Sequence, residues 1–299
     1  MTAEGLANFK GCKHLTELSL LSCTGVTDAA LANFKDSKNL WCLLIWNSDV
    51  TDAGIAHFKN CPNLERLQLN QTEVGDAGLA NFKDCKKLTE VGLSNTQVTD
   101  KGLAYLGGCK ELKQLGLFRT AIGDEGLAHL KGCKHLTIIN VSMTQVTDKG
   151  LAHFKDCADL EHLILDDTKV TDAGLAHFKT CKKLKSLSLY FENVTPQVTD
   201  AGLAHFKDCP NLGQLHVGNN KNITDAGLAH FKDCKRLIHV SLHYTQVTDA
   251  GVAPFKECKG LSTLNVRGTQ VGEGTVAALA KALPQCQITW DGPTIEPKN

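Results

Sequence analysis

The apolar and polar positions of this chain follow one short pattern many times over. The first half reads L-x-x-L-x-L, as in Leu64, Leu67 and Leu69, and its closing alternation is typical of a half-buried β-strand. The second half reads T-D-A-G-L-A-H-F-K, where Thr or Asp supplies a helix N-cap signal. A spacing of three places Leu175 and Phe178 on one helical face. Each turn of the pattern therefore predicts a strand followed by a short helix.

The pattern returns at a nearly constant interval, which the glycine of D-A-G marks. Successive markers are 24 residues apart except for steps of 25, 28 and 25. The marker positions are Gly5, Ala30, Gly54, Gly78, Gly102, Gly126, Gly150, Gly174, Gly202, Gly227, Gly251 and Thr275. Repetition at this period predicts a solenoid of about twelve repeats, because each repeat must cover its neighbours to bury an apolar face.

The spacing of the two kinds of element predicts the curvature of the stack. Neighbouring strands lie ~4.8 Å apart, whereas packed helices need ~8–10 Å. We therefore expect an α/β solenoid shaped as a curved horseshoe, with a parallel sheet on the concave face and short helices on the convex face. We expect one domain over residues 1–299, with repeats in 1–275, a capping helix and strand in 276–290, and a polar tail in 291–299.

These residues resemble a known family of repeats. The pattern L-x-x-L-x-L-x-x-T-x-V-T-D-x-G-L-A-x-F-K-x-C resembles a leucine-rich repeat of the cysteine-containing type, and segments such as AGLAHFKDCKRL (226–237) are similar to 24-residue arrays of planctomycete bacteria. The resemblance implies the leucine-rich-repeat fold and a bacterial source. One departure is that Thr72, Thr96 and the aligned threonines stand where many such repeats have Asn. A hydroxyl at this place can bond nearby backbone.

Charge and cysteine usage narrow the class of protein. Lys plus Arg and Asp plus Glu are both 32, so no basic excess favours nucleic acid. The longest strongly apolar run, LWCLLIW (40–46), is too short to cross a bilayer, which takes roughly 20 residues. Most of the 13 cysteines recur at one place in the repeat and none forms a C-x-x-C pair. We expect free, buried thiols, a cytoplasmic location, and no nucleic-acid or membrane partner.

No arrangement of residues typical of catalysis is present. Ser-His-Asp, P-loop and G-x-G-x-x-G contexts are all missing, so we expect neither an enzyme nor a cofactor. The histidine of G-L-A-H-F-K recurs on the predicted helices, and we expect it to form an exposed column without metal ligation. These positions are His57, His129, His153, His177, His205 and His230.

The strand positions that face the concave side differ from repeat to repeat. The fold does not dictate these residues, and many are aromatic, basic or Met side chains, which favour interfaces. We therefore predict a protein-binding site at Phe118, Arg119, Met143, His162, Asp166, Asp167, Tyr190, Phe191, His216, His239, His243, Tyr244 and Arg267. Leu44 and Trp46 form a separate apolar spot.

A four-residue insertion predicts a functional loop. The step from Gly174 to Gly202 is 28 residues, and the extra length lies in YFENVTPQ, Tyr190–Gln197. Two alternatives to a protein-binding or scaffold module stay open. The chain could be the recognition region of a larger signalling enzyme such as a kinase, or a ligand- or metal-binding module that uses His216, His239 and His243.

Overall fold

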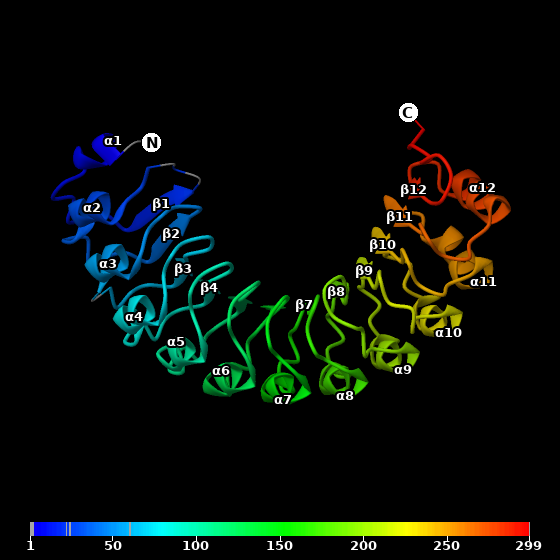
Figure 1. Ribbon diagram of the computed structural model, residues 1–299, viewed down its shortest axis with the longest axis horizontal. Helices are drawn as coiled ribbons and strands as arrows, with labels where there is room; N and C mark the ends of the chain where they lie inside the picture. The colour runs from blue at the N-terminus through cyan, green and yellow to red at the C-terminus, as the bar shows by residue number, and fades with distance from the viewer. Residues whose placement is uncertain (1–2, 22, 24, 60, 299) are drawn as a thin grey trace. The chain divides into compact units, whose positions relative to one another are not determined.

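The computed structural model describes residues 3–21, 23, 25–59 and 61–298. The chain divides into two compact units, Met1–Cys157 and Ala158–Asn299, called here the N-terminal and C-terminal units. In each unit parallel strands line one side of the stack, and short helices line the other (Figure 1). Each unit curves with its strands on the inside, as the strand and helix spacings predict.

The N-terminal unit contains β1 to β6 in chain order, all parallel. The strands are β1 (Glu17–Leu21), β2 (Cys42–Trp46), β3 (Arg66–Gln68), β4 (Glu90–Gly92), β5 (Gln114–Gly116) and β6 (Ile138–Asn140). The helices are α1 (Ala3–Ala7), α2 (Asp28–Leu31), η1 (Ala32–Phe34), α3 (Asp52–Ile55), η2 (Ala56–Phe58), α4 (Asp76–Leu79), η3 (Ala80–Phe82), α5 (Asp100–Ala104), α6 (Asp124–His129), α7 (Asp148–Leu151) and η4 (Ala152–Phe154).

The C-terminal unit contains β7 to β12, again parallel and in chain order. The strands are β7 (His162–Ile164), β8 (Ser186–Ser188), β9 (Gln214–His216), β10 (His239–Ser241), β11 (Thr263–Asn265) and β12 (Gln287–Thr289). The helices are α8 (Asp172–Leu175), η5 (Ala176–Phe178), α9 (Asp200–Leu203), η6 (Ala204–Phe206), α10 (Asp225–Leu228), η7 (Ala229–Phe231), α11 (Asp249–Val252), η8 (Ala253–Glu257) and α12 (Glu273–Ala282).

Most repeats contain one α-helical turn that tightens into a 3₁₀ turn, so the helix is shorter than a full T-D-A-G-L-A-H-F-K segment. In α8 and η5, Leu175 and Phe178 are both completely buried. Residues three apart point the same way in a 3₁₀ turn, which lets both side chains enter the core. The predicted histidine column is exposed only at His129, and the other five histidines are half-buried.

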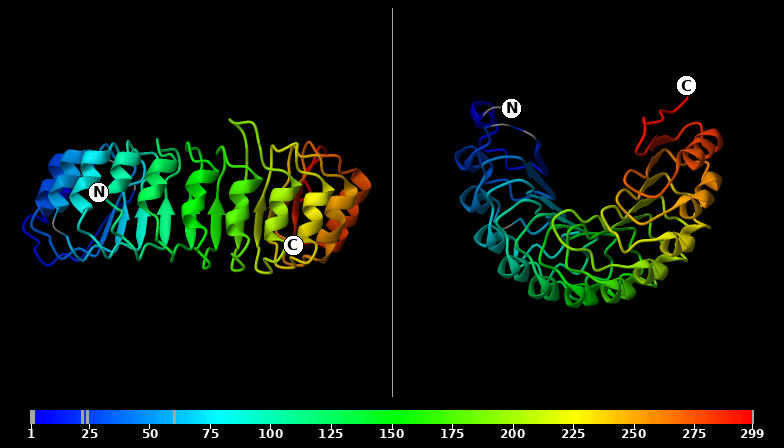
Figure 2. Two further views of the ribbon diagram at one scale, coloured as in Figure 1. Left: turned by 90° about the horizontal axis from the view of Figure 1, so that it is seen from below. Right: turned by 45° about the vertical axis from the view of Figure 1, so that its right-hand side comes forward.

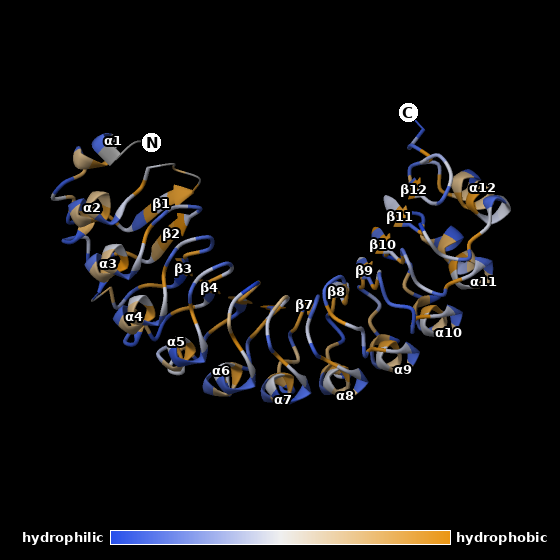
Figure 3. Ribbon diagram, in the orientation of Figure 1, coloured by the Kyte–Doolittle hydropathy of each residue, from blue (hydrophilic) through white to orange (hydrophobic). Residues whose placement is uncertain are grey.

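The core lies between strands and helices and is mostly aliphatic (Figure 3). The cysteines form part of it, as predicted: all 13 are free, and 11 of them are buried, with Cys12 and Cys23 half-buried. Seven thiols of the regular column donate to the carbonyl of the preceding repeat's cysteine, as from Cys85 Sγ to Cys61 O at 3.3 Å, and Cys61 Sγ donates to Ser37 O. Burial raises the pKa of Cys85 to about 12, so the thiol stays protonated.

Neighbouring repeats are joined by an aspartate that reaches across to the next helix start. Asp200 Oδ1 accepts from Thr224 N at 2.9 Å, and its Oδ2 accepts from Thr224 Oγ1 at 2.6 Å. Thr224 Oγ1 in turn accepts from Ala226 N at 3.2 Å, which caps α10. Thr is therefore the N-cap, and Asp is the first helical residue. The same joint links Asp28–Thr51, Asp76–Thr99, Asp124–Thr147, Asp172–Thr199 and Asp225–Thr248.

This joint explains the glycine of D-A-G. A Cβ placed on Gly227 would lie 2.3 Å from Asp200 Oδ1, and Gly54, Gly78, Gly102, Gly126, Gly150, Gly202 and Gly251 face the same conflict. Ala30 is the exception, and the residue aligned with Asp200 in the repeat before it is Ala3, which carries no carboxylate. The glycine is therefore required by the neighbouring repeat rather than by its own helix.

The aligned threonines bond within their own repeat. Thr72 Oγ1 donates to Leu69 O at 2.7 Å, and Thr96, Thr120, Thr144, Thr168 and Thr245 make the same bond to the residue three before. The threonine therefore closes its own turn. At the same place Asn220 reaches the neighbouring repeat instead, donating from Nδ2 to Val198 O at 2.9 Å.

The C-terminal residues fold back onto the last strand. The predicted last helix forms as α12, and the outer edge of β12 is occupied by an antiparallel bridge between Ile288 and Ile295. Each of these two residues donates its N–H to the other's carbonyl at 2.9 Å. Residues 291–298 therefore form part of the cap instead of leaving it as a tail. Within the residues described, no helix has the length and apolar character needed to cross a membrane.

Candidate partner-binding surface

The strand side of the C-terminal unit carries most of the predicted site residues. His162, His216 and His239 lie on β7, β9 and β10, and the register of β9 and β10 places Leu215 beside Val240. The residues that follow each strand form the turns above it. Asp166, Tyr190, His243, Tyr244 and Arg267 all belong to these turns.

Two tyrosines and a histidine are in contact here and are called the aromatic cluster. The rings of Tyr190 and His243 have centroids 5.5 Å apart, and those of His243 and Tyr244 are 5.7 Å apart in an edge-on arrangement. Ser241 Oγ bonds His243 Nδ1 at 2.8 Å, and Asn219 Nδ2 donates to Tyr190 Oη at 3.3 Å. The cluster therefore joins residues from three successive repeats.

Two glycines provide the space for these rings. A Cβ on Gly218 would lie 2.3 Å from the His243 ring, and a Cβ on Gly268 would lie 2.2 Å from the Tyr244 ring. Gly218 and Gly268 occupy the places that hold Tyr190 and Phe191 in the repeat of β8. No local sequence pattern links these glycines with the aromatic residues, because the contact is made between neighbouring repeats.

Tyr244 adopts a backbone conformation that its residue type disfavours. Its φ is 56°, in the left-handed region, and its side chain is 47% exposed. Asn47, Asn95 and Asn219 occupy the aligned place with similar φ angles, and Asn tolerates that region far better than Tyr. A bulky residue kept there at a cost of ~1–3 kcal/mol is typical of a functional position.

A half-buried carboxylate lies beside the histidines. Asp166 Oδ1 accepts from Ser188 Oγ at 2.6 Å and from Tyr190 N at 2.8 Å. Burial raises the pKa of Asp166, while these two bonds and nearby His216 oppose the rise. Burial lowers the pKa of His162, His216 and His243, so these three histidines are neutral near pH 7. These three side chains therefore gain positive charge only below the ordinary histidine range.

Two predicted contact residues are not exposed, and the sequence interpretation of them is wrong. Phe191 is 2% exposed, because the longer loop turns this side chain into the core. Asp167 is 7% exposed, and its carboxylate accepts from Glu192 N, Asn193 N and Asn193 Nδ2 at 2.6–2.9 Å. Asp167 is thus occupied in holding the inserted loop.

The inserted loop is fixed at both ends and projects beyond the neighbouring turns (Figure 2, left). Asp167 holds its first half, and Asn222 Nδ2 donates to Pro196 O at 3.0 Å in its second half. Glu192, Asn193, Thr195 and Gln197 are exposed. The loop is therefore a positioned element with polar side chains, and Tyr190 at its start remains its aromatic contribution to the surface.

The predicted residues of the N-terminal unit form a smaller group. Arg119 is exposed, Phe118 and Met143 are half-buried, and both Arg119 and Met143 have left-handed φ angles of 53° and 54°. The separate apolar spot is partly confirmed: Trp46 is 43% exposed, whereas Leu44 is only 9% exposed. Leu21, which pairs in register with Trp46, is 45% exposed and was missed.

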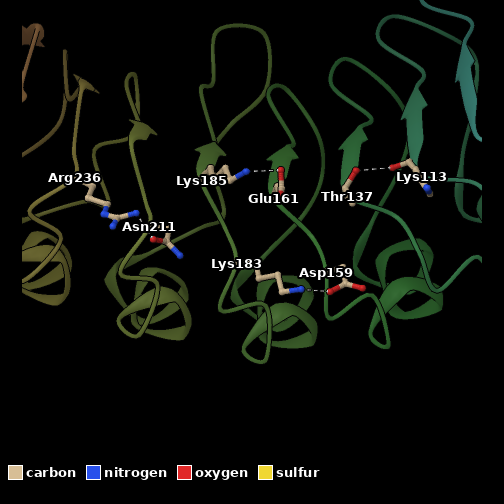
Figure 4. A network of polar contacts seen from close by, with 8 residues as sticks. All are labelled: Lys113, Thr137, Asp159, Glu161, Lys183, Lys185, Asn211 and Arg236. Atoms are coloured by element: carbon tan, nitrogen blue, oxygen red, sulfur yellow. Dashed lines mark hydrogen bonds and ion pairs between the residues drawn. The ribbon is translucent and has the colours of Figure 1, made fainter.

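Polar side chains follow the starting ends of the strands (Figure 4). In the C-terminal unit, Lys185 Nζ pairs with Glu161 at 2.8 Å and Lys183 Nζ pairs with Asp159 at 2.6 Å, each linking successive repeats. In the N-terminal unit, Thr137 Oγ1 donates to Lys113 O at 3.1 Å. Exposed ion pairs contribute at most ~1 kcal/mol, so these residues mark a polar rim. In the described part of the chain, no three His, Cys, Asp or Glu side chains are grouped so as to hold a metal ion.

Comparison with known families gives the class of this protein. The BspA-type leucine-rich repeat region matches in six copies, over residues 5–113, 120–197 and 152–275. The chain therefore belongs to the BspA-type leucine-rich repeat family, and the predicted α/β leucine-rich-repeat fold is confirmed. A search of curated proteins finds no match.

Solved structures resemble the chain in fold. An internalin of Listeria monocytogenes has a TM-score of 0.68 and 19% identity, covering 98% of this chain and 89% of that one. A leucine-rich repeat protein of Leptospira interrogans has a TM-score of 0.61 and 17% identity, covering 94% and 74%. FLRT2, in an octameric complex with latrophilin 3 and Unc5D, has a TM-score of 0.56 and 17% identity, covering 94% and 86%.

Proposed function

We propose that the C-terminal unit binds a protein partner on its strand side, with Tyr190, His243 and Tyr244 at the centre. The observation that carries this proposal is the aromatic cluster, in which Tyr244 keeps a disfavoured backbone conformation and an exposed ring. Aromatic side chains bury much area on binding at a low cost in conformational entropy. His216, His239 and Arg267 surround the cluster and supply polar contacts.

The class of protein supports binding rather than catalysis. FLRT2 is described within a complex of proteins, and a plant receptor of this fold is described with its peptide hormone. By analogy we assign this chain a binding or scaffold role without a cofactor. The zero net charge fits a protein partner better than nucleic acid. Free thiols fit a reducing compartment, and we propose the cytoplasm.

The test is affinity capture of partners from cells, followed by quantitative binding of each candidate to purified variants. Tyr190→Ala and Tyr244→Ala should each weaken binding by about tenfold or more, as expected for central aromatic residues. Tyr105→Ala is the matched control, since Tyr105 is 39% exposed at the end of α5. If all three variants bind as the original protein does, the site lies elsewhere.

A pH series separates this surface from other surfaces. The pKa of His216 and His243 is lowered by burial, so binding should be constant from pH 8 to about 6.5 and change below that. A partner that binds equally at pH 7.5 and pH 5.5 would not be using the histidines.

A further inference from the structure

A polar hollow of about 460 Å³ lies in the N-terminal unit, at the turns that follow β2, β3 and β4. Its lining includes Asn47, Ser48, Asp49, Gln71, Glu73 and Asn95. Asn47, Gln71 and Asn95 occupy one aligned place in three successive repeats, with left-handed φ angles of 55°, 56° and 52°. The turns therefore bring three side-chain amides and two carboxylates around one space.

This combination is confined to the hollow. The place that holds Asp49 and Glu73 holds Gln97, Ala121 and Gln145 in the next three repeats. The place that holds the three amides Asn47, Gln71 and Asn95 holds Arg119 and Met143 in the next two repeats. The repeat itself therefore does not require these carboxylates, and Gln71 is not a residue that favours a left-handed turn. Among the described residues, none of those lining the hollow is a lysine or an arginine.

A buried hydroxyl in the lining lacks a partner. Ser48 stands where Thr72 donates to Leu69 O at 2.7 Å, but Ser48 Oγ has neither a hydrogen bond nor accessible surface in this structure. Such a group is unfavourable when buried, because it has lost its bonds to water. Ser48 lines the hollow, but its Oγ has no accessible surface there, so a ligand can supply the missing partner only after a rotation about χ1.

An exposed indole lies at the margin of the hollow. Trp46 Nε1 donates to Gln71 Oε1 at 2.9 Å, so a lining residue fixes the orientation of the ring. The side chain is 43% exposed and offers a flat apolar face. A site with an apolar face beside amides and carboxylates matches a molecule that has both C–H faces and many hydroxyls.

We propose that this hollow binds a neutral saccharide. Carboxylates accept two hydroxyl donors each, and amides both donate and accept, so the lining can bond adjacent hydroxyls of a sugar ring. Two carboxylates repel an anionic ligand. Among the residues that the structure describes, no three His, Cys, Asp or Glu side chains are grouped, and the lining of the hollow offers two carboxylates, Asp49 and Glu73. This site lies in the N-terminal unit and does not depend on the proposed protein-binding surface.

The test uses the intact protein and a panel of neutral hexoses, N-acetylhexosamines and their disaccharides. Saturation-transfer NMR should detect at least one of them, and tryptophan fluorescence should change on binding. Asp49→Asn and Trp46→Ala should each weaken binding by about tenfold, as expected for losing a charged hydrogen bond or a stacking face. Trp41→Ala is the control, because Trp41 is 36% exposed and lies before β2, outside the hollow.

Two outcomes would overturn the proposal. One is that no saccharide of the panel gives saturation transfer or a fluorescence change, whatever calcium chloride does in the same assays. The other is that binding is equally strong in Asp49→Asn, Trp46→Ala and Trp41→Ala. Neither outcome bears on capture of a protein partner by Tyr190 and Tyr244, so the two proposals fail separately.

Discussion

The joints between repeats and the strand-side surface of the C-terminal unit occupy different places in the repeat, and their aligned positions behave in opposite ways. At the joints, Asp, Thr and Gly recur because each contacts the next repeat through a fixed set of bonds. On the surface, the aligned positions hold Tyr190, Gly218, His243 and Arg267 in four successive repeats. Regularity therefore reflects contacts between repeats, and variation marks positions that the stacking leaves free.

The largest contrast between scaffold and surface is expected from substituting two adjacent aromatic residues, Phe191 and Tyr190. Phe191→Ala should lower stability by about 3–5 kcal/mol, because its buried ring would leave a cavity. Tyr190→Ala should cost far less stability and should weaken partner binding. Urea unfolding together with a binding assay distinguishes them. The comparison fails if Phe191→Ala is as stable as the original protein.

The next largest effect should come from the joint. Gly227→Ala should destabilise by about 2–4 kcal/mol, because the new Cβ displaces a carboxylate held by two bonds. Gly274→Ala is the control, since Gly274 lies in α12 with open space around its Cα. The control should be neutral or stabilising by up to about 1 kcal/mol.

A double-mutant cycle tests the cause. In an Asp200→Ala background the conflict with the carboxylate is gone and the tightest remaining contact is Leu203 Cδ1 at 3.1 Å, so Gly227→Ala should cost less than about 1 kcal/mol there. Equal costs in the two backgrounds, measured by thermal or urea unfolding, would show that the glycine serves its own helix.

The buried positions of the core and the recurrence of Asp, Thr and Gly at the joint could be predicted from the sequence. The contacts that make those three residues recur could not. The spacing of Leu175, Phe178 and Cys181 identifies buried positions, because each repeat obeys the same local periodicity. The bond from Asp200 to Thr224 depends on how one repeat sits on the next, which no local pattern states. Phe191 was misassigned for a related reason: an insertion shifts the aligned positions, and the loop decides which side chain turns inward.

A smaller effect is expected from pH. Burial lowers the folded-state pKa of His162, His216 and His243, so the unfolded chain binds protons first as pH falls below about 6.5. Stability supplied by the neutral histidines is therefore present above that pH and is lost below it. The raised pKa of Asp166 acts in the opposite sense: as pH falls toward the ordinary value of 3.8, the folded chain takes up this proton before the unfolded chain does, and stability rises.

The measurement is the urea midpoint between pH 8 and pH 5 for the original protein and for His216→Gln. The urea concentration at the midpoint should decrease as the pH is lowered below 6.5, and this decrease should be smaller in His216→Gln. An unchanged midpoint across that range would mean that these histidines are as accessible in the folded chain as in the unfolded one.

The smallest change in stability is expected at Tyr244. Tyr244→Asn should stay within about 1 kcal/mol of the original, because relief of the left-handed backbone offsets the lost ring contacts. Partner binding should nevertheless be reduced. A clear loss of stability, seen as a lower melting temperature, would assign Tyr244 to the scaffold and not to the surface.

The column of cysteine thiols gives the stack a direction. The thiols of Cys85, Cys109, Cys133 and Cys234 each donate to the preceding repeat, whose cysteine offers a carbonyl, so the contact between two repeats is head-to-tail and leaves a new, identical face each time. An interface of this kind has no intrinsic copy number: a unit of 24 residues could be duplicated or deleted without inventing new chemistry. What ends such growth is the reversal at Ile288 and Ile295, where an antiparallel segment occupies the edge that another parallel strand would need.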